Sequence, residues 1–128
     1  MRCLVVDDDE LGRRMLAAFL AESYTCDLAA DGQEALDLVD QAWSAGKPYD
    51  FICLDIVMPV MDGSAALRQI RERDQQQGRR RTKVFMISAC STPQDIEDAF
   101  FEGDCDDYVV KPFQREAIAQ MLIRHKLS

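Results

Sequence analysis

Residues 51–63 read Phe-Ile-Cys-Leu-Asp-Ile-Val-Met-Pro-Val-Met-Asp-Gly, and this stretch decides the fold. Its four leading apolar residues stop at a carboxylate, Asp55, and a loop punctuated by Pro59 and Gly63 follows at once. A short, continuous apolar run bounded by such turn residues predicts a strand that is buried on both faces. Asp55 is therefore expected at the carboxyl end of a buried strand, held at the rim of a sheet.

Polar side chains end three further apolar runs in the same way. They are Asp7 and Asp8 after the first run, Ser88 at the end of the fourth and Lys111 after the fifth. In an open parallel α/β sheet the carboxyl ends of the strands form the ligand-binding edge. The sequence therefore predicts that these residues and Asp55 form one site, which contains three carboxylates, a hydroxyl and an ammonium group.

The chain alternates short apolar runs with segments of helical periodicity, which is the pattern of repeated βα units. The strands are expected at about residues 3–7, 25–29, 50–55, 83–88 and 107–111. Five such units with right-handed crossovers give a doubly wound α/β sheet with five helices. At 128 residues, without a linker or repeat, we expect one domain over residues 1–128.

Four of the five expected helices have an apolar stripe that should face the sheet. The stripes are Leu11, Met15, Ala18, Phe19 and Leu20 in the first helix, Ala35, Leu36, Val39, Ala42 and Trp43 in the second, Ile96, Ala99 and Phe100 in the fourth, and Ile118, Met121 and Leu122 in the fifth. Ser64 is a plausible N-cap for the third helix, whose polar end, residues 74–78, should be exposed. Thr92, Pro93 and Asp95 have the pattern of a helix start.

Composition limits the class of protein. The hydrophobic and charged fractions, 48% and 30%, are those of an ordinary soluble globular protein. No apolar run is long enough to span a membrane, and because the first residues already form a strand we expect no signal peptide. The five cysteines are odd in number, scattered and without a C-x-x-C pair, so we expect reduced thiols and a cytoplasmic protein.

The net charge of −8 argues against nucleic acid as a direct partner. One basic run, Arg79 to Arg81 with Lys83, is expected at the amino-terminal edge of the sheet, opposite Asp55. It can be a solvated loop or a docking patch. The single histidine, His125, lies near the end of the last helix, and we interpret it as a surface cation that favours the helix C-terminus.

Four motifs resemble the receiver domain of two-component response regulators over essentially the whole chain. They are the acidic pair in VVDDDE, the acceptor in LDIVMPVMDG, the hydroxyl in VFMISA and the lysine in DYVVKPF, in the family's order and with room for one helix between successive strands. The resemblance implies a flavodoxin-like fold with strand order 2-1-3-4-5. It also implies that Asp55 accepts a phosphoryl group from a histidine kinase or a phosphotransfer protein, and that the protein signals to a downstream protein target.

Three carboxylates brought together would repel one another unless a cation lies among them, and an all-oxygen site suits Mg²⁺. The resemblance implies that Asp8 and Asp55 bind Mg²⁺ directly, that Asp7 acts largely through water, and that the backbone carbonyl of Val57 is a further ligand. Alternatively, the acids of residues 7–9 merely begin a helix, where they favour the dipole.

The resemblance assigns the other polar residues to phosphoryl transfer, which requires positioning and charge neutralisation. Lys111 supplies positive charge, and the Lys111-Pro112 peptide bond, usually cis in the family, directs it across the sheet edge. Ser88 donates a hydrogen bond to a phosphoryl oxygen. Alternatively, Lys111 is a solvated lysine at a strand end, and the Ser88 hydroxyl caps a helix.

Tyr108 matches the family's switch aromatic, which fills the space vacated when Ser88 and its loop move toward the phosphoryl group. The affected surface would be the fourth helix, the fifth strand and the fifth helix. Tyr108 could instead be a static residue at the edge of the core. Val57 and Cys90 occupy the two positions that, in the family, tune the attack of water on the acyl phosphate, and neither side chain orients water well. Slow self-dephosphorylation is therefore expected.

Two other classes of protein share part of this pattern. A haloacid-dehalogenase-like phosphatase also uses an aspartate nucleophile with Mg²⁺, but it needs a second acid two residues later, where this chain has Val57. A nucleotide- or flavin-binding module needs a glycine-rich turn after the first strand, whereas residues 8–12 are acidic and would repel phosphate. A phosphoacceptor regulator, as distinct from a catalytic enzyme, fits better than either.

Overall fold

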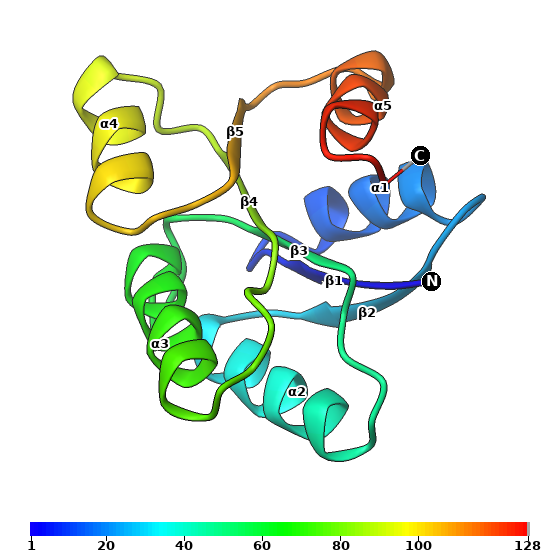
Figure 1. Cartoon of the computed structure of the whole chain (residues 1–128). Coiled ribbons are helices and arrows are strands. Elements are labelled where there is room, and N and C mark those ends of the chain that lie inside the picture. Colours follow the sequence, from blue (N-terminus) through cyan, green and yellow to red (C-terminus); the bar gives the residue numbers. More distant parts are fainter. Residues whose placement is uncertain (128) are drawn as a thin grey trace.

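Five parallel strands form one sheet in the order β2-β1-β3-β4-β5 (Figure 1). The structure is a computed structural model that describes residues 1–127. The elements are β1 (Arg2–Val6), α1 (Glu10–Leu20), β2 (Thr25–Ala29), α2 (Gly32–Ser44), β3 (Phe51–Leu54), α3 (Gly63–Gln76), β4 (Val84–Ser88), α4 (Pro93–Phe101), β5 (Asp107–Val110) and α5 (Arg115–Arg124). The predicted flavodoxin-like α/β fold is confirmed, and each strand end lies within one residue of its expected position.

Helices cover both faces of the sheet (Figure 1). Helices α1 and α5 lie on one face, and α2, α3 and α4 lie on the other. Alternate residues of each central strand enter the two cores: in β3, Ile52 and Leu54 face α2 and α3, while Phe51 and Cys53 face α1 and α5. This explains the continuous apolar run, because neither face of β3 meets water. None of the helices of residues 1–127 is long and apolar enough to cross a membrane.

Helix α1 presents a different face to the sheet from the one we expected. Leu16 and Leu20 are buried, whereas Leu11 is 66% and Met15 49% exposed. The carboxylate of Asp9 accepts a hydrogen bond from the backbone of the first turn, which fixes where α1 begins. The helix has apolar residues on two neighbouring faces, so periodicity alone could not identify the buried one.

Helix α4 also buries less than expected. Ala99 is buried, but Ile96 is half-buried and Phe100 is partly exposed. The start of α4 is as predicted: Thr92 and Asp95 form a capping box, and Pro93 occupies the first turn. The stripes predicted for α2 and α5 are confirmed, apart from Trp43, which is half-buried.

Two expectations about α3 were wrong. Its N-cap is Asp62, whose carboxylate accepts a hydrogen bond from the backbone N–H of Ala65, and Ser64 lies inside the first turn. Asp74, expected in an exposed polar end, is buried and accepts hydrogen bonds from the backbone N–H of Thr82 at 2.9 Å and from its hydroxyl at 3.1 Å. The carboxylate therefore joins the end of α3 to the segment that enters β4.

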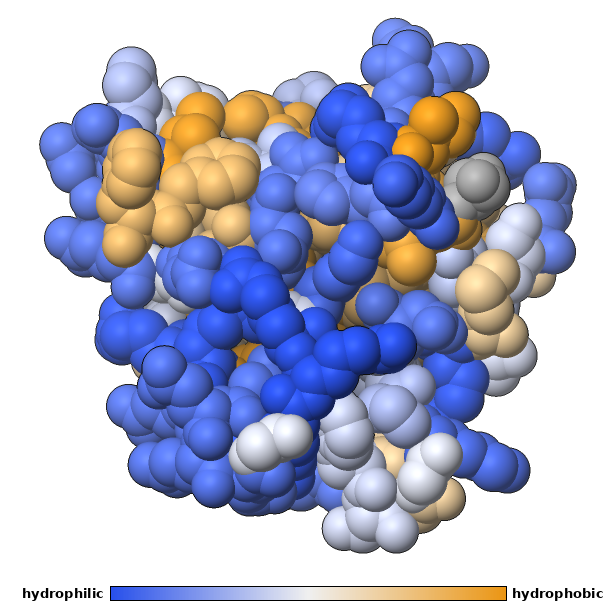
Figure 2. All heavy atoms as spheres, viewed as in Figure 1, coloured by the Kyte–Doolittle hydropathy of each residue, from blue (hydrophilic) through white to orange (hydrophobic). Residues whose placement is uncertain are grey.

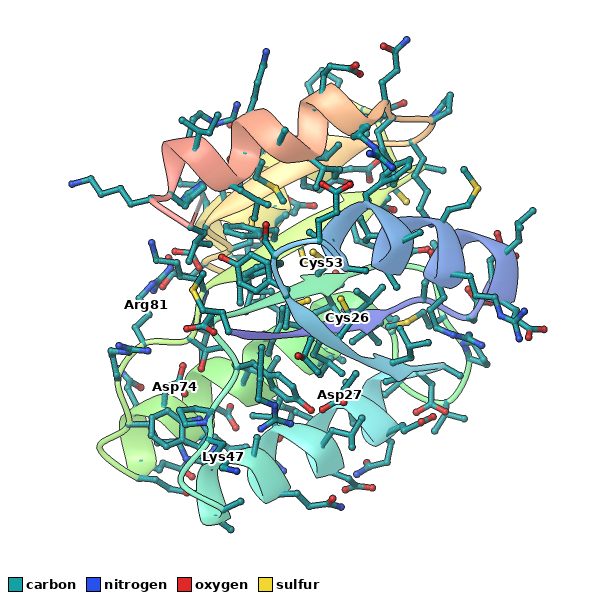
Figure 3. All side chains as sticks on the ribbon, turned by 90° about the vertical axis from the view of Figure 1, so that its right-hand side faces the viewer. Cys26, Asp27, Lys47, Cys53, Asp74 and Arg81 are labelled. Carbon is teal, nitrogen blue, oxygen red and sulfur yellow. The ribbon has the colours of Figure 1, made fainter. Side chains whose placement is uncertain are left out.

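The basic run lies in a loop before β4, where Arg80 and Arg81 are exposed as expected, but three of its four cations also bind groups of the chain. Arg79 forms an ion pair with Asp40 at 3.3 Å and stacks on Trp43. Arg81 binds Asp104 at 2.6 Å and also pairs with Asp106, and Lys83 donates to a backbone carbonyl of the C-terminal turn. Figure 3 shows Arg81 and Asp74 toward the same edge of the molecule. These side chains stabilise the amino-terminal edge of the sheet.

His125 is the C-cap of α5, near the helix C-terminus as expected, but it is half-buried and not at the open surface. Its Nε2 lies 3.0 Å from Asp107 Oδ2, and its ring packs on Phe85 at 4.7 Å between centroids. Burial raises the pKa of Asp107, but hydrogen bonds from Arg124, from the Tyr108 backbone and from His125 outweigh it, and the pKa is lowered. His125 thus joins the end of α5 to β5.

All five cysteines are free, as expected, and Cys3, Cys53 and Cys105 are buried. Burial raises the pKa of each of these three thiols, that of Cys105 to about 12. A thiol with a raised pKa stays protonated at neutral pH and behaves as a small apolar side chain.

Replacing Asp74 by alanine should destabilise the fold by about 2–4 kcal/mol, because the buried backbone N–H and hydroxyl of Thr82 then lose their acceptor. Urea unfolding measures this loss. Gln76→Ala, in the exposed last turn of the same helix, is the control and should change stability by less than about 0.5 kcal/mol. Equal effects of the two substitutions would show that Asp74 is no more than a helix-surface residue.

Candidate functional site

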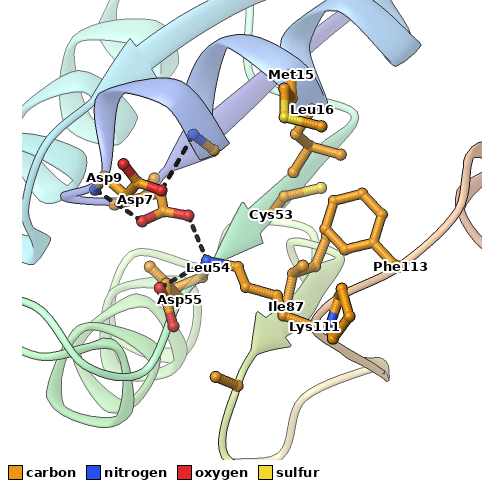
Figure 4. A pocket seen from close by; sticks show the side chains of 14 residues that line it. Asp7, Asp9, Met15, Leu16, Cys53, Leu54, Asp55, Ile87, Lys111 and Phe113 are labelled. Carbon is orange, nitrogen blue, oxygen red and sulfur yellow. Dashed lines mark hydrogen bonds and ion pairs between the residues drawn. The ribbon is translucent and has the colours of Figure 1, made fainter.

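The ends of three strands meet at one ammonium group (Figure 4). Lys111 Nζ lies 2.6 Å from Asp7 Oδ2 and 3.0 Å from Asp55 Oδ2. Both aspartates are buried, with 6% and 9% of their surface exposed, whereas Asp8 is exposed. Carboxylate oxygens of Asp7, Asp8 and Asp55 all lie within 4.8 Å of one another. The structure therefore brings together the three predicted carboxylates and the predicted lysine.

The backbone holds Asp55 on both sides. Its N–H donates to the Val6 carbonyl at 3.0 Å, and its Oδ1 accepts from the N–H of Ile56 at 2.7 Å. Gly63 closes the following loop against the strand end, where its N–H donates to the Ile56 carbonyl at 2.7 Å. A Cβ at Gly63 would lie 1.9 Å from the Asp55 carbonyl oxygen, so only glycine permits this approach.

The three aspartates of residues 7–9 make different contacts. Asp7 Oδ1 accepts from the backbone N–H of Asp9 at 2.9 Å, and Asp9 Oδ2 caps α1 by accepting from Gly12 N–H at 3.3 Å. Asp8 lies between them, exposed, and its carboxylate enters no ion pair or hydrogen bond within residues 1–127. The alternative reading as helix-start acids therefore holds for Asp9, while Asp8 keeps its carboxylate free for a ligand.

The ammonium of Lys111 is charged under all ordinary conditions. Burial lowers its pKa, but the hydrogen bonds and the attraction from Asp7 and Asp55 together outweigh burial, and the pKa is raised. Opposite charges about 4 Å apart near a protein surface attract by about 4 kcal/mol. One ammonium therefore offsets part of the repulsion between two buried carboxylates. The Lys111-Pro112 peptide bond is cis, as the resemblance implied.

Ser88 and Tyr108 lie beside this cluster and are connected through Cys90. The buried hydroxyl of Ser88 accepts from Cys90 N–H at 3.2 Å, while the Tyr108 hydroxyl donates to the Cys90 carbonyl at 2.6 Å. Burial raises the pKa of Tyr108 to about 12, so its hydroxyl is protonated and able to donate. Ser88 makes its hydrogen bond to its own loop and not to Asp55.

Val57 is exposed in the loop that follows Asp55, two residues beyond it. A haloacid-dehalogenase-like phosphatase needs its second acid at this position, and the valine side chain has no group that could donate a proton. In the same loop Val60 has φ +67°, a left-handed conformation that is strained for a β-branched residue.

A mainly apolar pocket of about 320 Å³ opens next to the carboxylates (Figure 4). Met15, Leu16, Cys53, Ile87 and Phe113 line it, and the charged groups of Asp7, Asp55 and Lys111 stand at its side. Sequence reasoning missed this pocket because it assigned Met15 to the core. The outward orientation of the α1 apolar residues, which only the structure shows, was the missing information.

The chain belongs to the response regulator receiver domain family, whose model matches residues 3–123. The family's members are phosphoacceptors and not catalytic enzymes, which agrees with the expectation from the sequence. The acidic cluster of Asp7, Asp8 and Asp55 is of the type found in receiver domains that bind Mg²⁺.

Among curated relatives, the two-component response regulator ORR41 of Oryza sativa subsp. japonica is 30% identical over 128 residues, which is 100% of this chain and 96% of that protein. Transcriptional regulatory protein ResD of Bacillus subtilis is 37% identical over 122 residues, but these are 94% of this chain and only 46% of ResD. The chain thus spans about half the length of some relatives.

Solved structures agree with this family. The CheX-CheY-BeF3-Mg+2 complex from Borrelia burgdorferi contains a chain with a TM-score of 0.86 and 29% identity, covering 100% of this chain and 90% of that chain. The receiver domain of Ssk1 from Saccharomyces cerevisiae, solved with the phosphotransfer protein Ypd1, has a TM-score of 0.82 and 26% identity, covering 94% and 85%. Related receivers therefore bind phosphotransfer proteins and CheX.

Mg²⁺ affinity should depend on Asp8 and not on Asp9. Asp8→Ala removes a carboxylate that is free for a ligand, whereas Asp9→Ala removes the cap of α1 and should instead cost about 1 kcal/mol of folding stability. Calorimetric Mg²⁺ titration and urea unfolding of both variants measure the two effects. If Asp9→Ala abolishes Mg²⁺ binding while Asp8→Ala retains it, the assignment of these two carboxylates is reversed.

Proposed function

We propose that this chain is a phosphorylation-dependent signalling switch that accepts a phosphoryl group on Asp55, from a histidine kinase or a phosphotransfer protein, in a Mg²⁺-dependent reaction. The observation that carries the proposal is the position of Asp55. Its carboxylate is fixed at a strand end, 3.0 Å from the Lys111 ammonium and within 4.8 Å of two further carboxylates. This arrangement provides both a nucleophile and the charges that phosphoryl transfer needs.

In the proposed step, an Asp55 carboxylate oxygen attacks phosphorus and forms an acyl phosphate bond. The phosphorus–nitrogen bond of a donor phosphohistidine breaks, and its electron pair returns to the imidazole. Lys111 lies where its ammonium can neutralise the charge of the incoming phosphoryl oxygens. Mg²⁺, held by Asp8, Asp55 and the Val57 backbone carbonyl with Asp7 acting through water, would neutralise phosphoryl charge as well.

The surface beside Asp55 supports a protein phosphodonor. Leu11 and Met15 expose apolar side chains on α1, and Met15 lines the apolar pocket together with Phe113. An exposed apolar patch of this kind marks a contact surface. We infer that the donor protein rests on this face of α1 and presents its phosphohistidine to Asp55.

The proposed output uses Ser88 and Tyr108. A phosphoryl group on Asp55 would accept a hydrogen bond from the Ser88 hydroxyl, whose oxygen accepts from Cys90 N–H and whose proton is therefore available to donate, and would draw Ser88 and its loop inward. Movement of this loop would also displace the Cys90 carbonyl, to which the Tyr108 hydroxyl donates. Phosphorylation would thereby shift the population of conformers on the surface formed by α4, β5 and α5, where a downstream protein binds.

Acetyl phosphate with Mg²⁺ should add one phosphoryl group to the protein, at Asp55. Asp55→Asn should remain unlabelled because the amide is not a nucleophile. Asp62→Asn, which alters another aspartate of the same loop, should be labelled like wild type. Intact-mass measurement distinguishes these results, and equal labelling of wild type and Asp55→Asn would overturn the proposal.

The phosphoryl group should be lost slowly. Hydrolysis needs a water held in line with phosphorus, and the positions that flank it carry Val57, which cannot form a side-chain hydrogen bond, and Cys90, which forms only weak ones. Replacing both, by Val57→Asn with Cys90→Glu, should accelerate phosphate release by about tenfold or more. Phosphate release is timed after removal of the donor. A double variant no faster than wild type would show that other groups determine the lifetime.

A further inference from the structure

The negative charge of this chain is concentrated in one segment. Residues 84–110 contain seven aspartates and glutamates and no lysine, arginine or histidine, whereas the whole chain has a net charge of −8. The segment contains α4 and the loop that leads from it to β5. Any partner of this part of the surface meets a strongly negative field.

The acids of this segment differ in whether a cation already neutralises them. Asp104, Asp106 and Asp107, after α4, form ion pairs with arginines. The acids of α4 and its C-cap, by contrast, form no ion pair within the described part of the chain; these are Asp95, Glu97, Asp98 and Glu102. These four acids therefore keep their charge unpaired within residues 1–127, although Glu102 shares a hollow with arginines such as Arg68 and Arg71.

The same helix exposes large apolar side chains. Phe101 is 81% exposed and Phe100 37%, although the sequence pattern predicted that Phe100 would be buried. With Pro93 and Ile96 they line a shallow hollow that continues to Cys105. Figure 2 shows hydrophobic surface gathered over α4, at the upper left of the view. We call these four residues, Pro93, Ile96, Phe100 and Phe101, the α4 apolar patch.

We propose that the α4 apolar patch binds a basic amphipathic segment of a partner protein, in which an apolar residue is flanked by lysines or arginines. The apolar residue would cover the exposed face of Phe101 and enter the hollow beside Ile96. The flanking cations would pair with acids such as Glu97 and Glu102. The inference deepens the proposed function, because it gives the chemistry of the partner, and it relies on that function only for control by phosphorylation.

Charge excludes the other classes of partner. The uncompensated acids repel nucleic acid and anionic membranes, which also carry negative charge. A second copy of this chain is a poor partner because two copies, each with a net charge of −8, repel one another, and three of the four cations of the basic run, Arg79, Arg81 and Lys83, already bind groups of their own chain. A cationic protein segment satisfies both the apolar patch and the surrounding acids.

The test uses two fluorescent helical peptides of about five turns that share one leucine face. The first carries lysine on its polar face and the second carries glutamate. Fluorescence anisotropy measures the affinity of each for the full chain, at low and high salt, with and without beryllofluoride and Mg²⁺. Tight binding of the lysine peptide alone is the expected result, with tighter binding when beryllofluoride replaces the phosphoryl group.

Matched variants locate the binding site. Phe101→Ser should weaken binding about tenfold, as loss of a central aromatic contact does, whereas Ile123→Ser, which alters an apolar side chain of α5 that is also exposed, should not. Glu97→Gln with Glu102→Gln should weaken binding and reduce its salt dependence. Glu10→Gln with Glu22→Gln removes the same charge near α1, on the other face of the sheet, and should do neither.

Three outcomes would overturn the proposal. The first is an equal loss of affinity in both members of either pair of variants, which would indicate unspecific attraction to a negative protein. The second is equal affinity for the two peptides. The third is a wild-type dimer, seen by sedimentation, that Phe101→Ser dissociates, which would make the patch a self-interface. Peptide binding with the expected variant pattern but indifferent to beryllofluoride supports the docking site and contradicts only its control by Asp55.

Discussion

The pair of contacts from the Lys111 ammonium to Asp7 and Asp55, 2.6 and 3.0 Å long, determines how the carboxyl edge of the sheet is built. The carboxylates of Asp7 and Asp55 have oxygens within 4.8 Å of each other and would repel each other if both were charged. The Lys111 ammonium contacts both carboxylates and offsets part of this repulsion. The contacts also join the ends of β1, β3 and β5: Lys111 is 104 residues from Asp7 and 56 residues from Asp55 in the chain. The charges that would neutralise a phosphoryl group are thus already part of the folded structure.

A second constraint is geometric. Asp55 can hold a fixed position only because the chain after it turns back closely, and Gly63 permits that turn by having no side chain. The loop between them contains a strained residue, Val60, with φ +67°. A strand end followed by a tight, strained loop gives the carboxylate the fixed position that the proposed phosphoryl transfer would need.

The strand pattern and the cluster of Asp7, Asp8, Asp55 and Lys111 could be predicted from the sequence, because apolar runs that end in polar residues depend on local order alone. What could not be predicted depends on tertiary choices. The apolar residues of α1 cover two faces, and only packing decides that Leu16 is buried and that others remain outside. The buried carboxylate of Asp74 was hidden in a polar sequence, since its partner is a backbone N–H, which no residue pattern reveals.

The carboxylates of this chain serve three purposes, and their neighbours decide which one. At the amino-terminal edge Asp74 and Asp106 are neutralised by arginines and backbone donors, so they contribute to stability. At the carboxyl edge a single lysine is shared between two aspartates while Asp8 keeps its charge, so the cluster attracts a further cation. On α4 the acids form no ion pair within the described chain, and Glu97 lines the same hollow as the exposed apolar residues. Arginines and backbone donors offset the charge of the carboxylates at the amino-terminal edge, whereas the acids of α4 have no ion-pair partner among residues 1–127. The acids of α4 can therefore attract the cations of a partner protein.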